Sequence, residues 1–182
     1  MQLTYETEHL LLSIGNEKFA DLIAAYLLRN REDFTRWDRQ LDENTFTREY
    51  QLRAVQAEIR LFMKSEGMRY YVFLKDDPNR VIGNITFSLV KNGNTKACEI
   101  GYKADKAERG KGYTFEAASF LIPLIIEEYR PSEIFAEILP ENRPALAFVQ
   151  KLGFRYDSIK RNVLKLDGLN RDALRYVLPV TD

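Results

Sequence analysis

The spacing of apolar and polar residues divides the chain into alternating helical and strand-like segments. Apolar positions recur at helical spacing over residues 17–29, and a second helix is predicted from Asn44 or Thr45 to residue 64. Further on, apolar runs predict strands over residues 81–90 and 97–103, with turn residues between them. The other predicted elements are strands at 9–14, 69–74, 133–139, 154–166 and 171–180, and helices at 114–129 and 142–151.

This order predicts a layered α/β fold with a mixed, mostly antiparallel twisted sheet flanked by helices. At 182 residues, the chain is expected to form one domain over residues 1–182. Residues 30–42 are polar and predicted to be loop-like, with Phe34 and Trp37 standing out. Residues 76–79 are predicted to form a turn, as are residues 91–94 and 167–170. Gly83, inside a strand, predicts a bulge or a close approach of two backbones.

Composition narrows the function classes. The chain has 27 Lys and Arg and 27 Asp and Glu, which argues against a nucleic-acid partner bound by phosphate neutralisation. No signal-peptide pattern or membrane-length apolar run is visible, so a cytoplasmic protein without a membrane partner is expected. One cysteine, Cys98, and one histidine, His9, are too few for a Cys-rich or His-rich metal site, and no metal is expected. Cys98 is predicted to be a core residue.

The most informative segment is the run Glu108-Arg109-Gly110-Lys111-Gly112-Tyr113, between a predicted strand and a predicted helix. Its glycines let the backbone approach a ligand closely. The first N–H groups of the following helix have no intrahelical acceptor and lie at the positive end of the helix dipole. This combination predicts a pyrophosphate site. The run is not a Walker loop, and Phe115 stands where a dinucleotide fingerprint has its third glycine.

Six short motifs follow one another along the chain between residues 30 and 154. They are Asn-Arg-x-x-Phe-x-x-Trp at 30–37, Ile-Gly-Asn-Ile at 82–85, Glu-Ile-Gly-Tyr at 99–102, Gly-Lys-Gly-Tyr at 110–113 with Glu116-Ala117, Pro-Glu-Asn at 140–142 and Lys-Leu-Gly-Phe at 151–154. Together they resemble the GNAT N-acetyltransferases over nearly the whole chain. Within that superfamily they look most like the Rim-type branch, whose named members acetylate the N-termini of ribosomal proteins.

The resemblance implies acetyl-CoA as co-substrate and direct acetyl transfer to a primary amine. It makes Glu99 the first candidate for the general base, with Glu137 as second choice, and gives Asn142 a catalytic or coenzyme-binding role. Phe34 and Trp37 would wall the acceptor cleft, or alternatively cap the sheet as core residues. The residues implied in coenzyme binding are Ile100, Gly101, Tyr102, Arg109, Gly110, Lys111, Gly112, Tyr113, Asn142, Phe148 and Lys151.

Three positions depart from the family pattern. Ala107 replaces the Arg or Gln that opens the coenzyme loop, with Lys106 or Arg109 as alternatives. Ala145 stands at the usual position of a serine, and Val149 at that of a general-acid tyrosine. The identities of the general acid and base therefore stay open at this stage.

The acceptor is also open. An α-amine has a pKa of about 7.7–8.0, so roughly a tenth is neutral at pH 7, against roughly 0.04% of a lysine amine. The sparse acid–base complement therefore favours a peptide or protein N-terminus. The alternatives are a small-molecule amine (polyamine, aminoglycoside or amino acid) and a non-catalytic acyl-CoA-binding protein. The resemblance also allows a homodimer.

Overall fold

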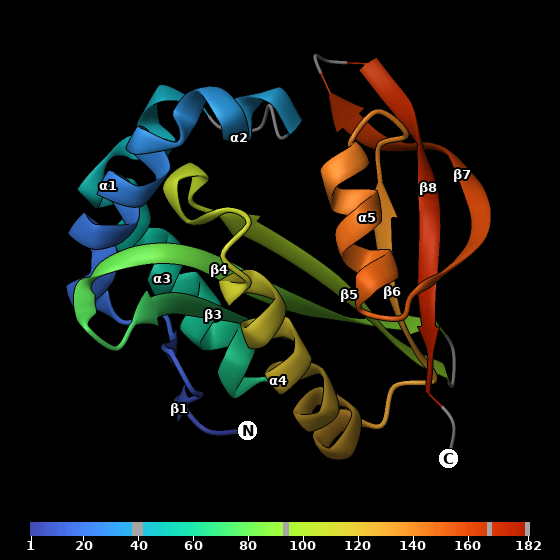
Figure 1. Ribbon diagram of the computed structural model, residues 1–182, viewed down its shortest axis with the longest axis horizontal. Coiled ribbons are helices and arrows are strands. Elements are labelled where there is room, and N and C mark those ends of the chain that lie inside the picture. Colours follow the sequence, from blue (N-terminus) through green and yellow to red (C-terminus); the bar gives the residue numbers. More distant parts are fainter. Residues whose placement is uncertain (38–41, 93–94, 167–168, 181–182) are drawn as a thin grey trace.

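A computed structural model describes residues 1–37, 42–92, 95–166 and 169–180 of the chain (Figure 1). Eight strands form one sheet in the order β1-β2-β3-β4-β5-β6-β8-β7. Neighbouring strands are antiparallel except β5 and β6, which are parallel, so the predicted mixed and mostly antiparallel sheet is confirmed. The strands are β1 (Thr4–Glu6), β2 (Leu10–Ile14), β3 (Gly67–Leu74), β4 (Asp77–Asn92), β5 (Thr95–Ala104), β6 (Glu133–Ile138), β7 (Arg155–Leu166) and β8 (Leu169–Pro179).

Helices cover both faces of the sheet, and the pleat sorts side chains between two apolar clusters. On β3, Tyr70 and Val72 join the cluster under α4 and α5, whereas Tyr71 and Phe73 join the cluster under α1, α2 and α3. The helices are α1 (Ala20–Arg29), α2 (Arg31–Trp37), α3 (Arg48–Met63), α4 (Tyr113–Tyr129) and α5 (Arg143–Lys151), with 3-10 turns η1 (Glu17–Phe19), η2 (Glu43–Phe46) and η3 (Lys106–Glu108).

The parallel ladder between β5 and β6 is short. It contains the pairs Ala97–Glu133, Cys98–Ile134 and Glu99–Phe135. Beyond Glu99, β5 continues to Ala104 paired with β4, and β6 continues to Ile138 paired with β8. The two strands diverge in Figure 1, and the edge of β5 that faces β6 is unpaired in the ladder after Glu99.

Two elements differ from the sequence-based expectation. Residues 31–37, expected to be loop-like, form α2, because Phe34 packs edge-on against Tyr26 with ring centroids 5.3 Å apart. The short edge strand β1 was not predicted; only three residues pair with β2. Its single half-buried residue gives no usable alternation.

The remaining predicted elements are confirmed with shifted ends. Residues 43–46 form a 3-10 turn capped by Asp42, so the helix expected from 44 or 45 begins at Arg48, after its cap Thr47. The turn expected at 76–79 lies at 75–76, and β4 begins at Asp77. The expected turns at 91–94 and 167–170 include residues outside the described part of the chain.

Gly83 confirms the expected close approach. A Cβ built on it would lie 2.9 Å from the carbonyl oxygen of Lys103 on β5. The register between β3 and β4 also shifts beside it, between Val72 and Phe73. Cys98 is fully buried in the core, as expected.

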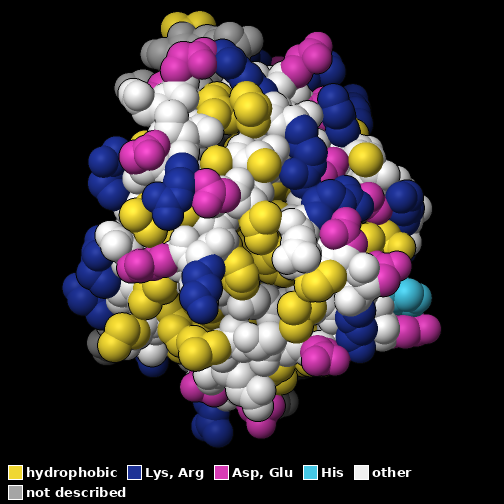
Figure 2. All heavy atoms as spheres, turned by 90° about the vertical axis from the view of Figure 1, so that its left-hand side faces the viewer, with side chains coloured by type: hydrophobic (Ala, Val, Ile, Leu, Met, Phe, Trp, Pro, Cys, Tyr) yellow, Lys and Arg dark blue, Asp and Glu magenta, His cyan; other side chains and the backbone are white. Residues whose placement is uncertain are grey.

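The side of the molecule that carries α1 and α3 is shown in Figure 2, where basic and acidic side chains are interleaved with apolar ones. A surface of mixed sign does not favour a polyanion. Among the described residues, no helix has the length and apolar character needed to cross a bilayer.

Candidate active site

The segment between β5 and α4 has the geometry of an anion-binding loop. Gly110 has φ 78° and Gly112 has φ 91°, values that favour glycine. A Cβ at either position would meet no atom within 4 Å, so both face open space. Glu116 donates its N–H to the Gly112 carbonyl at 2.9 Å, and the N–H groups of the preceding first turn have no intrahelical acceptor. The backbone arrangement that the sequence predicted is therefore present.

Carboxylates engage both basic side chains of this loop. Lys111 Nζ lies 2.9 Å from the Glu108 carboxylate, and Arg109 Nη1 lies 2.8 Å from Asp33 on α2. Glu108 also accepts a hydrogen bond from Arg80 Nη2 at 2.7 Å. Burial alone would raise the Glu108 pKa, but the hydrogen bonds from Arg80 and Lys111 outweigh it and hold the pKa below its usual value. The first N–H groups of α4 therefore have no intrahelical acceptor, whereas both basic side chains of the loop already have carboxylate partners.

Asn30, the first residue of the motif at 30–37, links the end of α1 to the segment that leads into the glycine loop. Its side chain is buried, donates to the Tyr26 carbonyl at 2.9 Å and accepts the N–H of Lys106 at 2.8 Å. The junction of α1 and α2 is therefore fixed to the start of the coenzyme loop.

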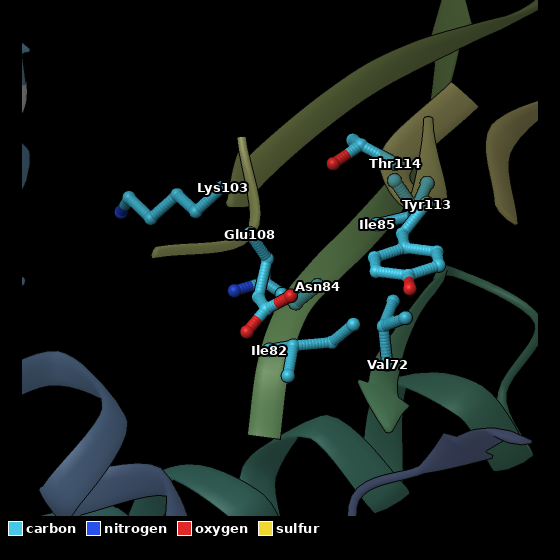
Figure 3. A pocket seen from close by; sticks show the side chains of 9 residues that line it. Val72, Ile82, Asn84, Ile85, Lys103, Glu108, Tyr113 and Thr114 are labelled. Carbon is cyan, nitrogen blue, oxygen red and sulfur yellow. The ribbon is translucent and has the colours of Figure 1, made fainter. Parts of the chain in front are cut away.

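A small pocket lies under the loop, against β4 (Figure 3). Glu108 and Tyr113 reach into it from the loop and α4, while the Lys103 side chain points away from it. The Tyr113 ring lies 6.1 Å from the ring of His9, between centroids. Tyr113 is partly buried against the core cluster under α4, and its predicted contact with coenzyme stays a prediction.

Aromatic and basic side chains meet where α5 faces the diverging part of β5. Tyr102 and Phe148 have ring centroids 4.2 Å apart, and Lys151 Nζ lies 4.3 Å from the centre of the Phe115 ring at the start of α4. Three of the predicted coenzyme residues, Tyr102, Phe148 and Lys151, are therefore brought together near the loop.

Glu99 occupies the last paired position before β5 and β6 separate. Its carboxylate is half-buried, on the sheet face opposite α4 and α5. Burial raises its pKa, the nearby Glu137 raises it further, and Arg175 opposes both. Gly101, the next residue on that face, is exposed, and a Cβ there would meet no atom within 4 Å. The first candidate base therefore lies beside open space at the separation of the strands.

Sequence reasoning missed Arg175. Its guanidinium lies 2.6 Å from Glu133 and 3.2 Å from Glu137, and its centre is 3.6 Å from the middle of the Phe135 ring. These groups are 38 to 42 residues from Arg175 along the chain. The alternation Glu133, Phe135, Glu137 would have shown that the two acids share a face, but not that an arginine from a later strand joins them.

Other predicted site residues have structural contacts. Asn142 caps α5 by accepting the N–H of Ala145 at 3.3 Å, which leaves its amide N–H₂ group for another partner. Val149 is 1% exposed and belongs to the core. Phe34 is 5% exposed and packed in the cluster under α1, which favours its alternative interpretation as a core residue. Trp37 is half-buried, with the Arg36 guanidinium 4.9 Å from its ring.

Comparison with known sequences identifies similar proteins over most of the chain. The [ribosomal protein uS5]-alanine N-acetyltransferase of Escherichia coli (strain K12) is 27% identical over 177 residues, covering 97% of this chain and 90% of that protein. The probable N-acetyltransferase YjcK of Bacillus subtilis (strain 168) is 27% identical over 143 residues, covering 79% of this chain and 78% of that protein.

Solved structures share the fold. The ribosomal-protein-S5-alanine acetyltransferase of Vibrio fischeri superposes with a TM-score of 0.90 at 22% identity, covering 100% of this chain and 98% of that one. The family model for the acetyltransferase (GNAT) domain matches residues 10–155. The family predicted from the separated motifs is thereby confirmed: the chain belongs to the GNAT acetyltransferases.

Proposed function

We propose that this protein transfers the acetyl group of acetyl-CoA to the α-amino group of a protein or peptide N-terminus. The observation that carries the proposal is the place of Glu99, a half-buried carboxylate with a raised pKa at the point where β5 and β6 separate. An amine that reaches this point meets a base next to an open strand edge.

The open edge of β5 suits the coenzyme arm. Peptide groups of Ile100 and Gly101 lie beyond the parallel ladder and can pair with the amides of pantetheine as an added strand would. The loop at Gly110 and Gly112 then receives the pyrophosphate at the start of α4. Tyr102 and Phe148 flank the arm on the α5 side. This arrangement brings the thioester carbonyl toward Glu99.

The raised pKa of Glu99 suits a proton acceptor for an α-amine. An acceptor ammonium of pKa about 7.7–8.0 loses its proton more readily to a carboxylate whose own pKa is raised. The neutral amine attacks the thioester carbon, the carbon–sulfur bond breaks, coenzyme A leaves as a thiolate, and the extra proton on the new amide nitrogen passes to this thiolate or to water. A thiol pKa of about 8.5 makes this thiolate a competent leaving group near neutral pH, which reduces the need for a hydroxyl at Ala145 or Val149.

Backbone N–H groups at the separation of the strands can hold the oxyanion that forms on the thioester carbon. The free amide N–H₂ of Asn142 is available to an ordered water or to the coenzyme arm. The role of Asn142 is the catalytic or coenzyme-binding one that the sequence predicted for it.

The names of similar proteins support an N-terminal acceptor. The Escherichia coli relative is named for acetylating an alanine of ribosomal protein uS5. A solved RimL structure, TM-score 0.82 at 19% identity, is described as a ribosomal L7/L12 α-N-protein acetyltransferase in complex with coenzyme A. We take a ribosomal or other protein N-terminus in the cytoplasm as the working acceptor, and a homodimer stays a prediction.

One observation favours a polycationic small amine as second candidate. Glu133, Glu137 and Asp157 lie around Arg175 on the sheet face opposite α4 and α5, and Glu99 lies near enough for its pKa to be affected by Arg175 and Glu137. A surplus of carboxylates attracts an amine with several positive charges. The acceptor panel described next separates this candidate from a peptide.

The test is release of coenzyme A thiol from acetyl-CoA by the purified protein with different amines. The panel pairs a peptide with a free N-terminus and its N-terminally blocked copy carrying one lysine, and adds a polyamine, an aminoglycoside and free amino acids. We expect release with the free N-terminus and little with the blocked copy. Glu99→Gln should lower kcat about 10²–10⁴-fold, the usual contribution of a positioned general base.

Glu49→Gln, at an exposed position on α3, is the matched control and should act as the unchanged protein does. Release with the polyamine alone would replace the peptide acceptor by the second candidate. Binding of acetyl-CoA without release by any amine would favour the non-catalytic reading.

A further inference from the structure

Arg175 is a largely buried arginine on the sheet face opposite α4 and α5. It lies on β8 directly opposite Glu137 in the register, and its side chain is only 12% exposed. The guanidinium lies flat against Phe135 and bonds Glu133 on one side and Glu137 on the other. Three contacts from one strand fix the position of the charge.

Phe135 on β6 is the register partner of Glu99 on β5. The Arg175 guanidinium, which lies over Phe135, is therefore held above the strand next to the candidate base. Glu137 follows Phe135 on the same face, just past the point where the strands separate. Two carboxylates so placed repel each other, and the charge of Glu137 raises the pKa of Glu99 unless a cation offsets it. The arginine bonds Glu137 and leaves Glu99 without that bond.

We propose that Arg175 is a positioning residue for acetyl transfer: it pairs with Glu137 and offsets its negative charge, so that Glu99 stays ionised as the base that receives the proton of the amine. This inference rests on the proposed function. It differs from a purely structural role because the charge of residue 175, and not only its packing, must matter.

The other charges near Glu99 lie on several elements. On β4, its register partner is the uncharged Ser88. Glu137 and Arg175 are the charged groups that act on its pKa. Other charged groups on this face include Glu133 on β6, Asp157 on β7 at 3.8 Å from Arg175, Lys103 further along β5, Arg171 on β8, and Arg69 of β3 with its partner Glu58 of α3.

The sign of the effect follows from these neighbours. The positive charge of Arg175 lowers the pKa of Glu99, and the negative charge of Glu137 raises it. Removal of the arginine charge therefore protonates Glu99 at a higher pH, and activity is lost first on the acid side of the pH profile. Removal of the Glu137 charge has the opposite effect.

The test compares the pH dependence of kcat/KM for the free N-terminal peptide in four variants of the full chain. In Arg175→Met, the ratio of kcat/KM at pH 6 to that at pH 9 should fall about fivefold below the unchanged protein. Arg175→Lys keeps the charge and should keep the ratio. Glu137→Gln should raise it, and Arg175→Met combined with Glu137→Gln should restore it.

An Arg175→Met ratio equal to that of the unchanged protein would overturn the inference. So would an equal fall in Arg175→Lys, because that result would mean a role in packing. If Arg175→Met does not fold, the Glu137→Gln variant tests the inference alone. A ratio of kcat/KM at pH 6 to that at pH 9 equal to that of the unchanged protein would then overturn the inference.

A second readout separates this inference from the proposed function. The Glu99 carboxyl is titrated by NMR in coenzyme-free protein, with Glu99→Gln used to assign the signal. If the unchanged protein acetylates no peptide, the proposed function fails. A higher Glu99 pKa in Arg175→Met than in Arg175→Lys would still support control of Glu99 by the arginine, and equal values would refute it.

Discussion

Replacement of Gly101 by alanine separates the function of the open strand edge from the stability of the fold. Gly101 is exposed, its φ lies outside the left-handed region, and an added Cβ meets no atom within 4 Å. The fold should therefore accept the methyl group. Because glycine inside a strand is less stable than alanine by roughly 0.5–1 kcal/mol, Gly101→Ala should raise Tm by about 1–4 °C.

The same methyl group should impair acetyl transfer. It projects from the open face of β5, two residues after Glu99, where the coenzyme arm and the amine would meet. Insertion of a methyl group into a filled contact costs about 1–3 kcal/mol. That cost corresponds to a fall in kcat/KM of about 5- to 150-fold, since about 1.4 kcal/mol is a factor of ten.

Thermal melting followed by circular dichroism, and kcat/KM for the free N-terminal peptide, measure the two effects on the same preparation. Gly112→Ala is the matched control for the added methyl group. A Cβ at this position would also meet no atom within 4 Å, whereas its φ of 91° strains any L-residue. It should lower Tm, with a cost of about 1–3 kcal/mol. A Gly101→Ala protein with unchanged kcat/KM would refute the placement of the site, and a lower Tm would refute the packing argument.

Two further predictions concern the sheet and the coenzyme loop. Gly83→Ala should lower Tm by several degrees, because its Cβ would lie 2.9 Å from the backbone oxygen of Lys103; an unchanged melting curve would contradict this contact. Glu108→Gln should destabilise the protein at pH 7 in urea unfolding. The folded-state pKa of Glu108 is lowered, so its contribution is present above the unfolded value of about 4.3 and is lost as pH falls through the folded value. The two proteins should therefore become equally stable toward pH 3, and a difference that persists there would exclude this cause.

Local signals were enough to predict the backbone of the glycine loop at Gly110 and Gly112 and the elements that flank it. Gly110 and Gly112 have the positive φ values that their residue type indicates, and Asn142 caps α5 as its position before Arg143-Pro144 suggests. These features depend on a few neighbouring residues, and such features can be read from one sequence.

The elements and site residues that were missed depend on distant partners. Helix α2 has one buried residue, Phe34, and is held by Tyr26 and by the pair of Asp33 with Arg109. Arg175 on β8 meets its acids on the neighbouring strand β6, and the residue pattern within β8 alone does not predict that contact. The raised pKa of Glu99 likewise results from burial and from a charge on another strand.

The short parallel ladder has a consequence for how the molecule opens. Three residue pairs join the β1–β5 half of the sheet to the β6–β8 half. Proteins open locally in cooperative units, so β5 and β6 are expected to separate at this short ladder in the free protein while the shared core cluster holds the two halves together. A coenzyme hydrogen-bonded along the edge of β5 would link them, and amides at 100–104 and 136–138 would then exchange with deuterium at a common, slower rate. The exchange of these few amides would thus report how much of the protein carries coenzyme.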